Sequence, residues 1–238
     1  VSAFLLNRSS DLAIIERDPS IEMVQGNRIF YSDTPIIGGI SQEEEFASSK
    51  SVRDYFFNRN VLPVMAWNKL ISKKFLTDHG LYFMEGILYE DNAWTFYMVK
   101  HLQHLHVIPD ITCNHYKRPL SITTGTGKIE AAHHLSIIYE DIARHFTPGE
   151  EAREAKHYLR SYFSCSMRYH MMEGYQRTLP LYEKAMVGNG YRKERFLLWV
   201  LKLSFRSGFL RGMLAFLVKI YRALLYSFRR LATLWNKH

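Results

Sequence analysis

The order of hydrophobic patterns in the middle of the chain restricts the fold more than any other feature. Apolar residues spaced three and four apart predict helices, and short apolar runs between them predict strands. The segments alternate as helix, strand, helix, strand, which indicates an α/β fold. The first predicted segment is a helix over 65–76, for which Gly80 is the stop signal. It is followed by an extended run over 81–88, a helix that begins near Glu90, and strands over 105–108 and 111–115.

The N-terminal part of the chain is predicted to contain strands and turns. Apolar runs at 21–24 and 28–31 flank a short connection that contains Gly26, which is the pattern of a β-hairpin. A run of three glutamates lies within 41–45, and acidic residues favour the first turn of a helix. We therefore expect a hairpin around Gly26 and a helix that starts at 41–45.

The C-terminal half of the chain is predicted to be helical. Thr147 and Glu150 have the spacing of a capping box, so a long helix should start there and run to about Met172. The glycines within 188–190 are expected to form a linker.

Composition narrows the class of protein. Of the 238 residues 47% are hydrophobic, which excludes a disordered chain, and two cysteines are too few for a disulfide scaffold or a four-cysteine zinc site. No run of about 18 apolar residues lacks a charge, so we expect no conventional transmembrane helix. The chain starts at Val1 with no signal-peptide pattern, and we expect a fragment or a processed chain.

The triplet Tyr-Glu-Asp occurs twice, and the two copies lie in different contexts. Asp141 lies inside a continuous helical run over 129–146, where a carboxylate is expected on a solvated face. Asp91 lies where an extended segment meets a helix, a junction at which a side chain can project into a cleft. Two interpretations of Asp91 stay open from the residues alone: a functional carboxylate, or a cap of its own helix.

Histidines are concentrated at His101, His104 and His106, with His133 and His134 further along. Two histidines on one helix face could bind a metal, but β-branched residues indicate that the helix has ended by His106, and no Cys or carboxylate lies at ligand spacing. A zinc site is not expected. The chain also contains no glycine-rich phosphate-binding motif and no Asp-x-Asp motif.

Four short motifs follow one another in an order that is typical of one enzyme family. The motifs are Trp67-Asn68-Lys69-Leu70, Phe83-Met84-Glu85-Gly86, Glu90-Asp91 and Arg118-Pro119-Leu120-Ser121-Ile122. In this order they resemble the second half of family 2 glycosyltransferases of bacterial surface-polysaccharide synthesis. The resemblance covers roughly residues 61–124, with weaker similarity upstream from Val1.

The resemblance implies a partial GT-A fold, in which a mixed α/β sheet supports transfer of a sugar from a nucleotide-diphosphate donor to a hydroxyl with inversion. It implies that Asp91 is the general base, because a sugar hydroxyl is a poor nucleophile until a positioned carboxylate removes its proton. It further implies that Arg118, with His115 and Lys69, would meet the leaving diphosphate or help to close the loop at 121–128. Surface charges beside a strand are the alternative for these cations. The resemblance assigns substrate binding to Glu90, Trp67, Lys69, His115, Arg118 and Ser121.

The chain also departs from the family pattern. The family usually has two tyrosines before the arginine, and this chain has Cys113 and His115 there, which puts contacts made by those rings in doubt. The family's first half, with its nucleotide site and Asp-x-Asp metal motif, has no counterpart in these residues. We therefore expect a truncated enzyme that is inactive on its own, with Mg²⁺ or Mn²⁺ required by the full-length enzyme only.

The positive charge is confined to the C-terminal tail. The whole chain carries +8, whereas residues 192–238 carry +10 and residues 1–191 carry −2. On a helical projection the tail separates cations from large apolar residues, which is the pattern of a helix that lies on an anionic membrane surface. A helix packed on the protein's own core is the alternative. The cations expected at the membrane are Arg211, Lys219, Arg222, Arg229 and Arg230.

These patterns predict a partial GT-A-like mixed sheet followed by a helical C-terminal region. The expected parts are an acceptor-side glycosyltransferase part over 1–124, a helical subdomain over 125–190 and a basic amphipathic tail over 191–238. The predicted function is transfer of a sugar from a nucleotide-sugar donor to a growing or lipid-linked surface polysaccharide, peripherally, at the cytoplasmic face of the bacterial inner membrane. A non-catalytic membrane-binding or scaffolding module of polysaccharide assembly is the alternative. Nucleic acid is not an expected partner, because the charge outside the tail is slightly negative.

Overall fold

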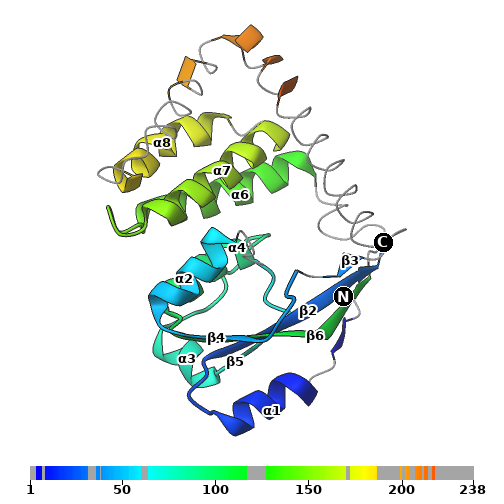
Figure 1. Ribbon diagram of the computed structural model, residues 1–238. Coiled ribbons are helices and arrows are strands. Elements are labelled where there is room, and N and C mark those ends of the chain that lie inside the picture. The colour runs from blue at the N-terminus through cyan, green and yellow to red at the C-terminus, as the bar shows by residue number, and fades with distance from the viewer. Residues whose placement is uncertain are drawn as a thin grey trace, which may run out of the picture. The chain divides into compact units, whose positions relative to one another are not determined.

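The chain divides into two compact units, Val1–His145 and Phe146–His238, and each is described here by itself (Figure 1). The predicted division at 124 and 190 stays a prediction. The computed structural model describes residues 4–6, 9–31, 36–37, 39–59, 64–116, 127–169, 172–186, 199, 202–203, 207–210, 212–213 and 216–217.

The described residues of the first unit form a six-stranded mixed sheet. At its centre two long strands run parallel to each other, β2 (Met23–Tyr31) and β6 (His104–Tyr116). The mixed sheet and its helices confirm the predicted α/β fold. The four outer strands pair antiparallel with this central pair: β4 (Glu44–Ala47) and β1 (Phe4–Leu6) with β6, and β5 (Lys69–Ile71) and β3 (Ile36–Ile37) with β2.

Helices cover both faces of this sheet. Figure 1 shows α1 on one side and α2 and α4 on the other. Ile14 and Ile108 belong to the small apolar cluster under α1, whereas Phe56 and Leu105 belong to the larger core under α2 and α4. Burial of these side chains gives the sheet its main stabilisation, since a fully buried large apolar side chain contributes about 1.5–3 kcal/mol. The helices are α1 (Ser9–Arg17), α2 (Ser49–Asn58), α3 (Lys73–Asp78), α4 (Asp91–His101) and α6 (Lys128–Arg144).

The two central strands run without interruption through the places where a hairpin and a break were predicted. Both predictions are wrong, because Gly26 does not turn the chain and β6 continues through Pro109. The register of β2 against β6 shifts on both sides of Asn27, and a Cβ at Gly26 would lie 2.4 Å from Thr112 Cγ2. The glycine therefore allows a close approach within an irregular strand pair. Asn27 Nδ2 secures that irregularity by donating to the Pro109 carbonyl at 2.8 Å.

The helix predicted to start at 41–45 begins later. Residues Glu44–Ala47 form β4, and Ser48 is the N-cap of α2, with its hydroxyl accepting the Ser51 N–H at 3.2 Å. The acidic run was therefore misread as a helix start. Glu44 instead accepts a hydrogen bond from the Arg59 guanidinium at 2.8 Å, so its charge is satisfied across the element boundary.

The helix predicted over 65–76 is replaced by a strand and a short helix. Leu70 and Ile71 belong to β5, where they pair with β2, and α3 follows a separate cap in which Ser72 Oγ accepts the Phe75 N–H at 3.3 Å. Pairing with a strand that lies more than forty residues earlier in the chain overrides the local helical spacing. The helix predicted to begin near Glu90 is confirmed, since α4 begins at Asp91 and ends at His101.

The described part of the second unit is mainly a pair of helices, α7 (Ala152–Tyr169) and α8 (Met172–Met186). Buried tyrosines join them, and the rings of Tyr162 and Tyr175 lie 5.3 Å apart. The predicted capping box is formed with a different partner: the Thr147 N–H donates to Glu151 Oε2 at 2.7 Å. Helix α7 therefore starts two residues after Glu150, and it ends before Met172.

The described positions of the tail expose large apolar side chains. Phe209 is 80% exposed and Phe216 is 62% exposed. Among the residues that the structure describes, no helix has both the length and the apolar character needed to cross a membrane. The predicted linker at 188–190 and the cations Arg211, Lys219, Arg222, Arg229 and Arg230 lie outside the described residues.

Candidate active site

Asp91 is the first residue of α4 and follows a loop with unusual backbone geometry. Gly86 has a φ of 70° and Tyr89 has a φ of 65°. A left-handed conformation costs a non-glycine residue about 1–2 kcal/mol, and such residues cluster at functional sites. The loop that leads to Glu90 and Asp91 therefore contains a non-glycine residue, Tyr89, in an unfavourable backbone conformation.

The carboxyl group of Asp91 has a strongly shifted acidity. Burial raises its pKa, the neighbouring Glu90 charge raises it further, and the opposing effect of Lys69 leaves it at about 6. The carboxylate accepts a hydrogen bond from Asn92 Nδ2 at 3.0 Å. A carboxylate that mainly caps a helix would have a lowered pKa, because N–H donors favour its charged form. Burial and Glu90 therefore dominate over capping, and Asp91 is ionised at neutral pH yet basic enough to accept a proton.

Lys69 is buried on β5 and carries a charge that acts on Asp91. Burial lowers its pKa to about 7, Arg28 lowers the pKa in the same direction, and Asp91 opposes both effects. Its ammonium group donates a hydrogen bond to the Met65 carbonyl. Lys69 is 5% exposed. Its influence on Asp91 is therefore electrostatic, through the protein interior.

Hydrogen bonds to two elements hold the turn that carries Trp67 and Lys69. Asn68 Nδ2 donates to the Gly26 carbonyl at 3.3 Å, and Thr95 Oγ1 donates to the Val64 carbonyl at 2.9 Å. One bond reaches β2 and the other reaches α4. The Trp-Asn-Lys-Leu motif is therefore fixed against the same helix that carries Asp91.

Arg28, Trp67 and His115 form a second part of the site, next to Lys69. The Arg28 guanidinium lies over the Trp67 ring, with Cζ 5.9 Å from the ring centroid, and the ring centroids of Trp67 and His115 are 5.1 Å apart. Burial lowers the pKa of His115, and the Arg28 charge lowers it further. Burial also lowers the pKa of Arg28 itself. A cation over an aromatic ring in a partly desolvated place is a suitable feature for an anionic ligand.

The structure thus links the predicted residues Glu90, Asp91, Lys69, Trp67 and His115 through direct contacts or charge interactions. Their substrate contacts stay predictions. Arg28 was missed because its strand was interpreted as one arm of a hairpin. The available signal was a cation within an otherwise apolar strand-like run. The predicted residues Arg118 and Ser121 lie outside the described residues.

Asp141, in the other triplet, is not on the fully solvated face that was predicted. The Tyr97 hydroxyl donates to Asp141 Oδ2 at 2.7 Å, and the same hydroxyl lies 2.9 Å from His145 Nδ1. Burial raises the pKa of Tyr97, and the bond to Asp141 raises it further. This cluster joins α4 to α6 and gives Asp141 a structural partner.

The histidines have separate partners. The rings of His101 and His79 stack with centroids 4.4 Å apart, His106 Nε2 lies 2.7 Å from Glu43 Oε1, and His134 Nδ1 accepts the Leu88 N–H at 2.6 Å. Within the described ranges, no three His, Cys, Asp or Glu residues gather in a way that could hold a metal ion. The neighbouring carboxylates of Glu90 and Asp91 are not joined by a third such ligand in the part of the chain that the structure describes.

No protein-family model matches this chain, and a search of the curated proteins finds no match either.

Proposed function

We propose that this chain is the acceptor-side part of an inverting glycosyltransferase with a GT-A-type fold. The observation that carries the proposal is the environment of Asp91, a half-buried carboxylate of pKa about 6 at the start of a helix, under the influence of a buried lysine. A general base works best when its pKa lies near the pH at which it operates. Strongly shifted pKa values cluster at functional sites, so the shift supports a role in proton transfer.

In the proposed reaction, the oxygen of an acceptor hydroxyl forms a bond to the anomeric carbon of the donor sugar. The bond from that carbon to the diphosphate breaks on the opposite face, and its electron pair leaves with the nucleoside diphosphate. Asp91 takes the hydroxyl proton as the new bond forms. One displacement with one base gives inversion, so the reaction needs no second nucleophilic carboxylate.

Positive charge in the site has a role in the same reaction. The leaving diphosphate gains negative charge, which preorganised cations stabilise. Arg28 over Trp67 is the described cation best placed to face an anionic ligand. Lys69 is buried and acts on the charge balance around Asp91. The Mg²⁺ or Mn²⁺ expected for the full-length enzyme would take its ligands from other residues, since the described carboxylates here do not fit it.

The tail provides the proposed contact with a membrane. Its described positions expose Trp199, Phe209, Phe216 and other apolar side chains, and residues 192–238 carry a net charge of +10. Apolar side chains together with cations favour binding to anionic lipid surfaces. A lipid-linked acceptor and a peripheral location at the cytoplasmic face of the inner membrane agree with this arrangement. The measurement is flotation: a 191–238 peptide should float with anionic liposomes at low salt, and a peptide that stays in the dense fraction would exclude this role.

The test of the enzymatic proposal is Asp91→Asn in the full-length enzyme, assayed with a panel of nucleotide-sugar donors. Without a base, transfer should fall by about 10²- to 10⁴-fold while donor binding is unchanged. Asp78→Asn is the matched control, because Asp78 is an exposed carboxylate that pairs with Lys74 on α3. Undiminished transfer by Asp91→Asn would refute the assignment and favour the non-catalytic module.

A further inference from the structure

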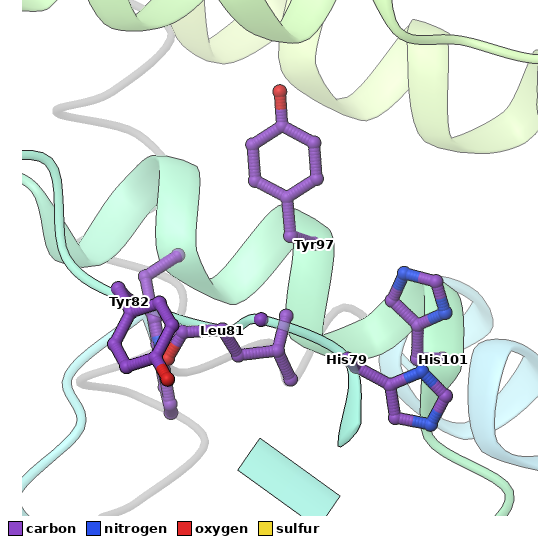
Figure 2. A pocket seen from close by; sticks show the side chains of 7 residues that line it. His79, Leu81, Tyr82, Tyr97 and His101 are labelled. Carbon is purple, nitrogen blue, oxygen red and sulfur yellow. The ribbon is translucent and has the colours of Figure 1, made fainter. Parts of the chain in front are cut away.

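A pocket of about 230 Å³ lies beside α4, among side chains that the proposed reaction does not use. Five ring side chains line it, together with Gly80 and Leu81. Figure 2 shows the rings of His79 and His101 side by side at one part of the pocket and Tyr82 at another. The lining side chains with rings are His79, Tyr82, Trp94, Tyr97 and His101.

Several of these rings are fixed in place by their own contacts. The Trp94 Nε1–H donates to the Leu81 carbonyl at 3.2 Å, and the indole is only 4% exposed, so it contributes a small, fixed part of its ring to the lining. The Tyr97 hydroxyl is bound to Asp141 at 2.7 Å and points away from the other labelled rings in Figure 2. The rings of His79 and His101 stack with an interplanar angle of 18°. The pocket is therefore a prearranged set of aromatic surfaces.

Polar groups with hydrogen-bonding capacity remain at its edge. Tyr82 is 74% exposed, and in the part of the chain that the structure describes neither its hydroxyl nor the imidazole of His79 makes a hydrogen bond. A phenol hydroxyl and a neutral imidazole can each donate and accept. The pocket thus combines aromatic faces with hydrogen-bond donors and acceptors.

The chemistry of the lining restricts what can bind. It contains no Asp, Glu, Lys or Arg, so it offers no charged side chain to an ion. Metal ligands must converge on one point. The two stacked imidazoles lie nearly parallel, so their in-plane nitrogens do not converge in this way. A neutral ligand with an apolar face and several hydroxyls satisfies both the rings and the polar groups. A sugar ring has this character.

We propose that this pocket binds one neutral sugar residue of the acceptor glycan. The proposal rests on the proposed function, because it gives the pocket a part in holding the acceptor. Trp94, Tyr97 and His101 follow Asp91 on the same helix, so they lie about 5 to 15 Å from it along the helix axis. A volume below the roughly 300 Å³ of drug-sized pockets fits a single sugar ring. The glycan held there extends toward Asp91, where its terminal hydroxyl reacts.

The experiment is saturation-transfer-difference NMR on the 238-residue chain with methyl glycosides of glucose, galactose, N-acetylglucosamine and rhamnose, each at about 1 to 10 mM. At least one glycoside should receive saturation at its ring C–H protons, because these face the aromatic side chains. Tyr82→Ala and His79→Ala should each weaken binding about five- to ten-fold. Tyr82→Phe keeps the ring and should lose about two- to five-fold through the missing hydroxyl.

His133→Ala is the matched control, because His133 is an exposed histidine of the same unit outside the pocket. It should bind as the unchanged chain does, and circular dichroism should show that all variants are folded. Absence of saturation for every glycoside would overturn the proposal. Saturation that survives both Tyr82→Ala and His79→Ala would overturn it as well, since the sugar would then bind elsewhere.

A further variant separates this proposal from the proposed function. Asp91→Asn should leave glycoside binding unchanged in the NMR experiment while abolishing transfer in the full-length enzyme. Transfer that persists in Asp91→Asn would refute the role of Asp91 without affecting the pocket. In the full-length enzyme, Tyr82→Ala should raise KM for the acceptor about five-fold and leave KM for the donor unchanged.

Discussion

The two Tyr-Glu-Asp triplets carry identical side chains and have opposite properties. Asp91 follows a left-handed Tyr89 at the start of α4, where burial and Glu90 raise its pKa to about 6. Asp141 lies in the interior of α6, where the Tyr97 hydroxyl donates to it. One carboxylate is kept in an environment unfavourable to its charge, and the other is satisfied by a partner. The position in the backbone, rather than the triplet, decides the environment of each carboxylate.

The largest difference should appear in the pH dependence of transfer. In the proposed reaction only ionised Asp91 accepts a proton, so the rate of transfer should fall about ten-fold per pH unit below a pKa of about 6. The measurement is kcat/KM against pH. Asp141→Asn should keep this acid limb at the same pH, and a limb that moves in this variant would show that the two carboxylates are not functionally distinct.

Stability should respond to the two substitutions with opposite signs. The folded pKa of Asp91 lies above its unfolded value of 3.8, so its contribution to stability is fully present below pH 3.8 and is lost as pH rises through about 6. At pH 7 Asp91→Asn should therefore raise the free energy of unfolding by about 1–2 kcal/mol, after allowance for solvent screening.

Asp141→Asn should lower the free energy of unfolding by about 1 kcal/mol, because the hydroxyl of Tyr97 then loses its charged acceptor. Urea unfolding of the chain at pH 4 and pH 7 measures both effects. The gain from Asp91→Asn should be small at pH 4 and complete at pH 7. Equal destabilisation by both substitutions would remove the distinction between the triplets.

A smaller effect should follow from changing the charges around Asp91. Lys69→Met removes a charge that lowers the pKa of Asp91, so the acid limb of transfer should move up by about 0.5–1 pH unit. Glu90→Gln removes a charge that raises this pKa, and the limb should move down. Lys73→Met is the control, since Lys73 is exposed on α3 and should leave the limb in place.

The smallest expected effect is the pairwise coupling between Tyr97 and Asp141. A double-mutant cycle of Tyr97→Phe and Asp141→Asn should give a coupling of about 0.5–1.5 kcal/mol in the free energy of unfolding. Coupling near zero would mean that the 2.7 Å hydrogen bond adds nothing to stability, and it would remove this difference between Asp141 and Asp91.

The sequence was informative where structure depends on neighbours in the chain. The start of α4 near Asp91 was predicted, because an extended run ends there and apolar residues at helical spacing follow it. Glu90, Asp91, Trp67 and Lys69 were selected from short motifs, and the structure connects them.

Features that depend on distant pairing were not predictable. Gly26 looks like a hairpin residue, and only the position of Thr112 on the neighbouring strand shows that it serves a close strand approach. Arg28 enters the site because β2 lies beside β6, which comes about eighty residues later. The shift in the pKa of Asp91 likewise requires the burial that the folded core provides.

The central place of β6 also determines when this unit can fold. The pairing partners of β6 among the described residues (β1, β2 and β4) precede it in the chain, and its parallel pairing with β2 joins residues about eighty positions apart. Such non-local contacts slow folding, because a long loop must close before they form. During synthesis from the N-terminus, the sheet lacks its common neighbour until residue 116 has emerged from the ribosome. Until then Met23 and Val24 on β2 are without their partners on β6, so the nascent chain spends this interval exposed to wrong pairings.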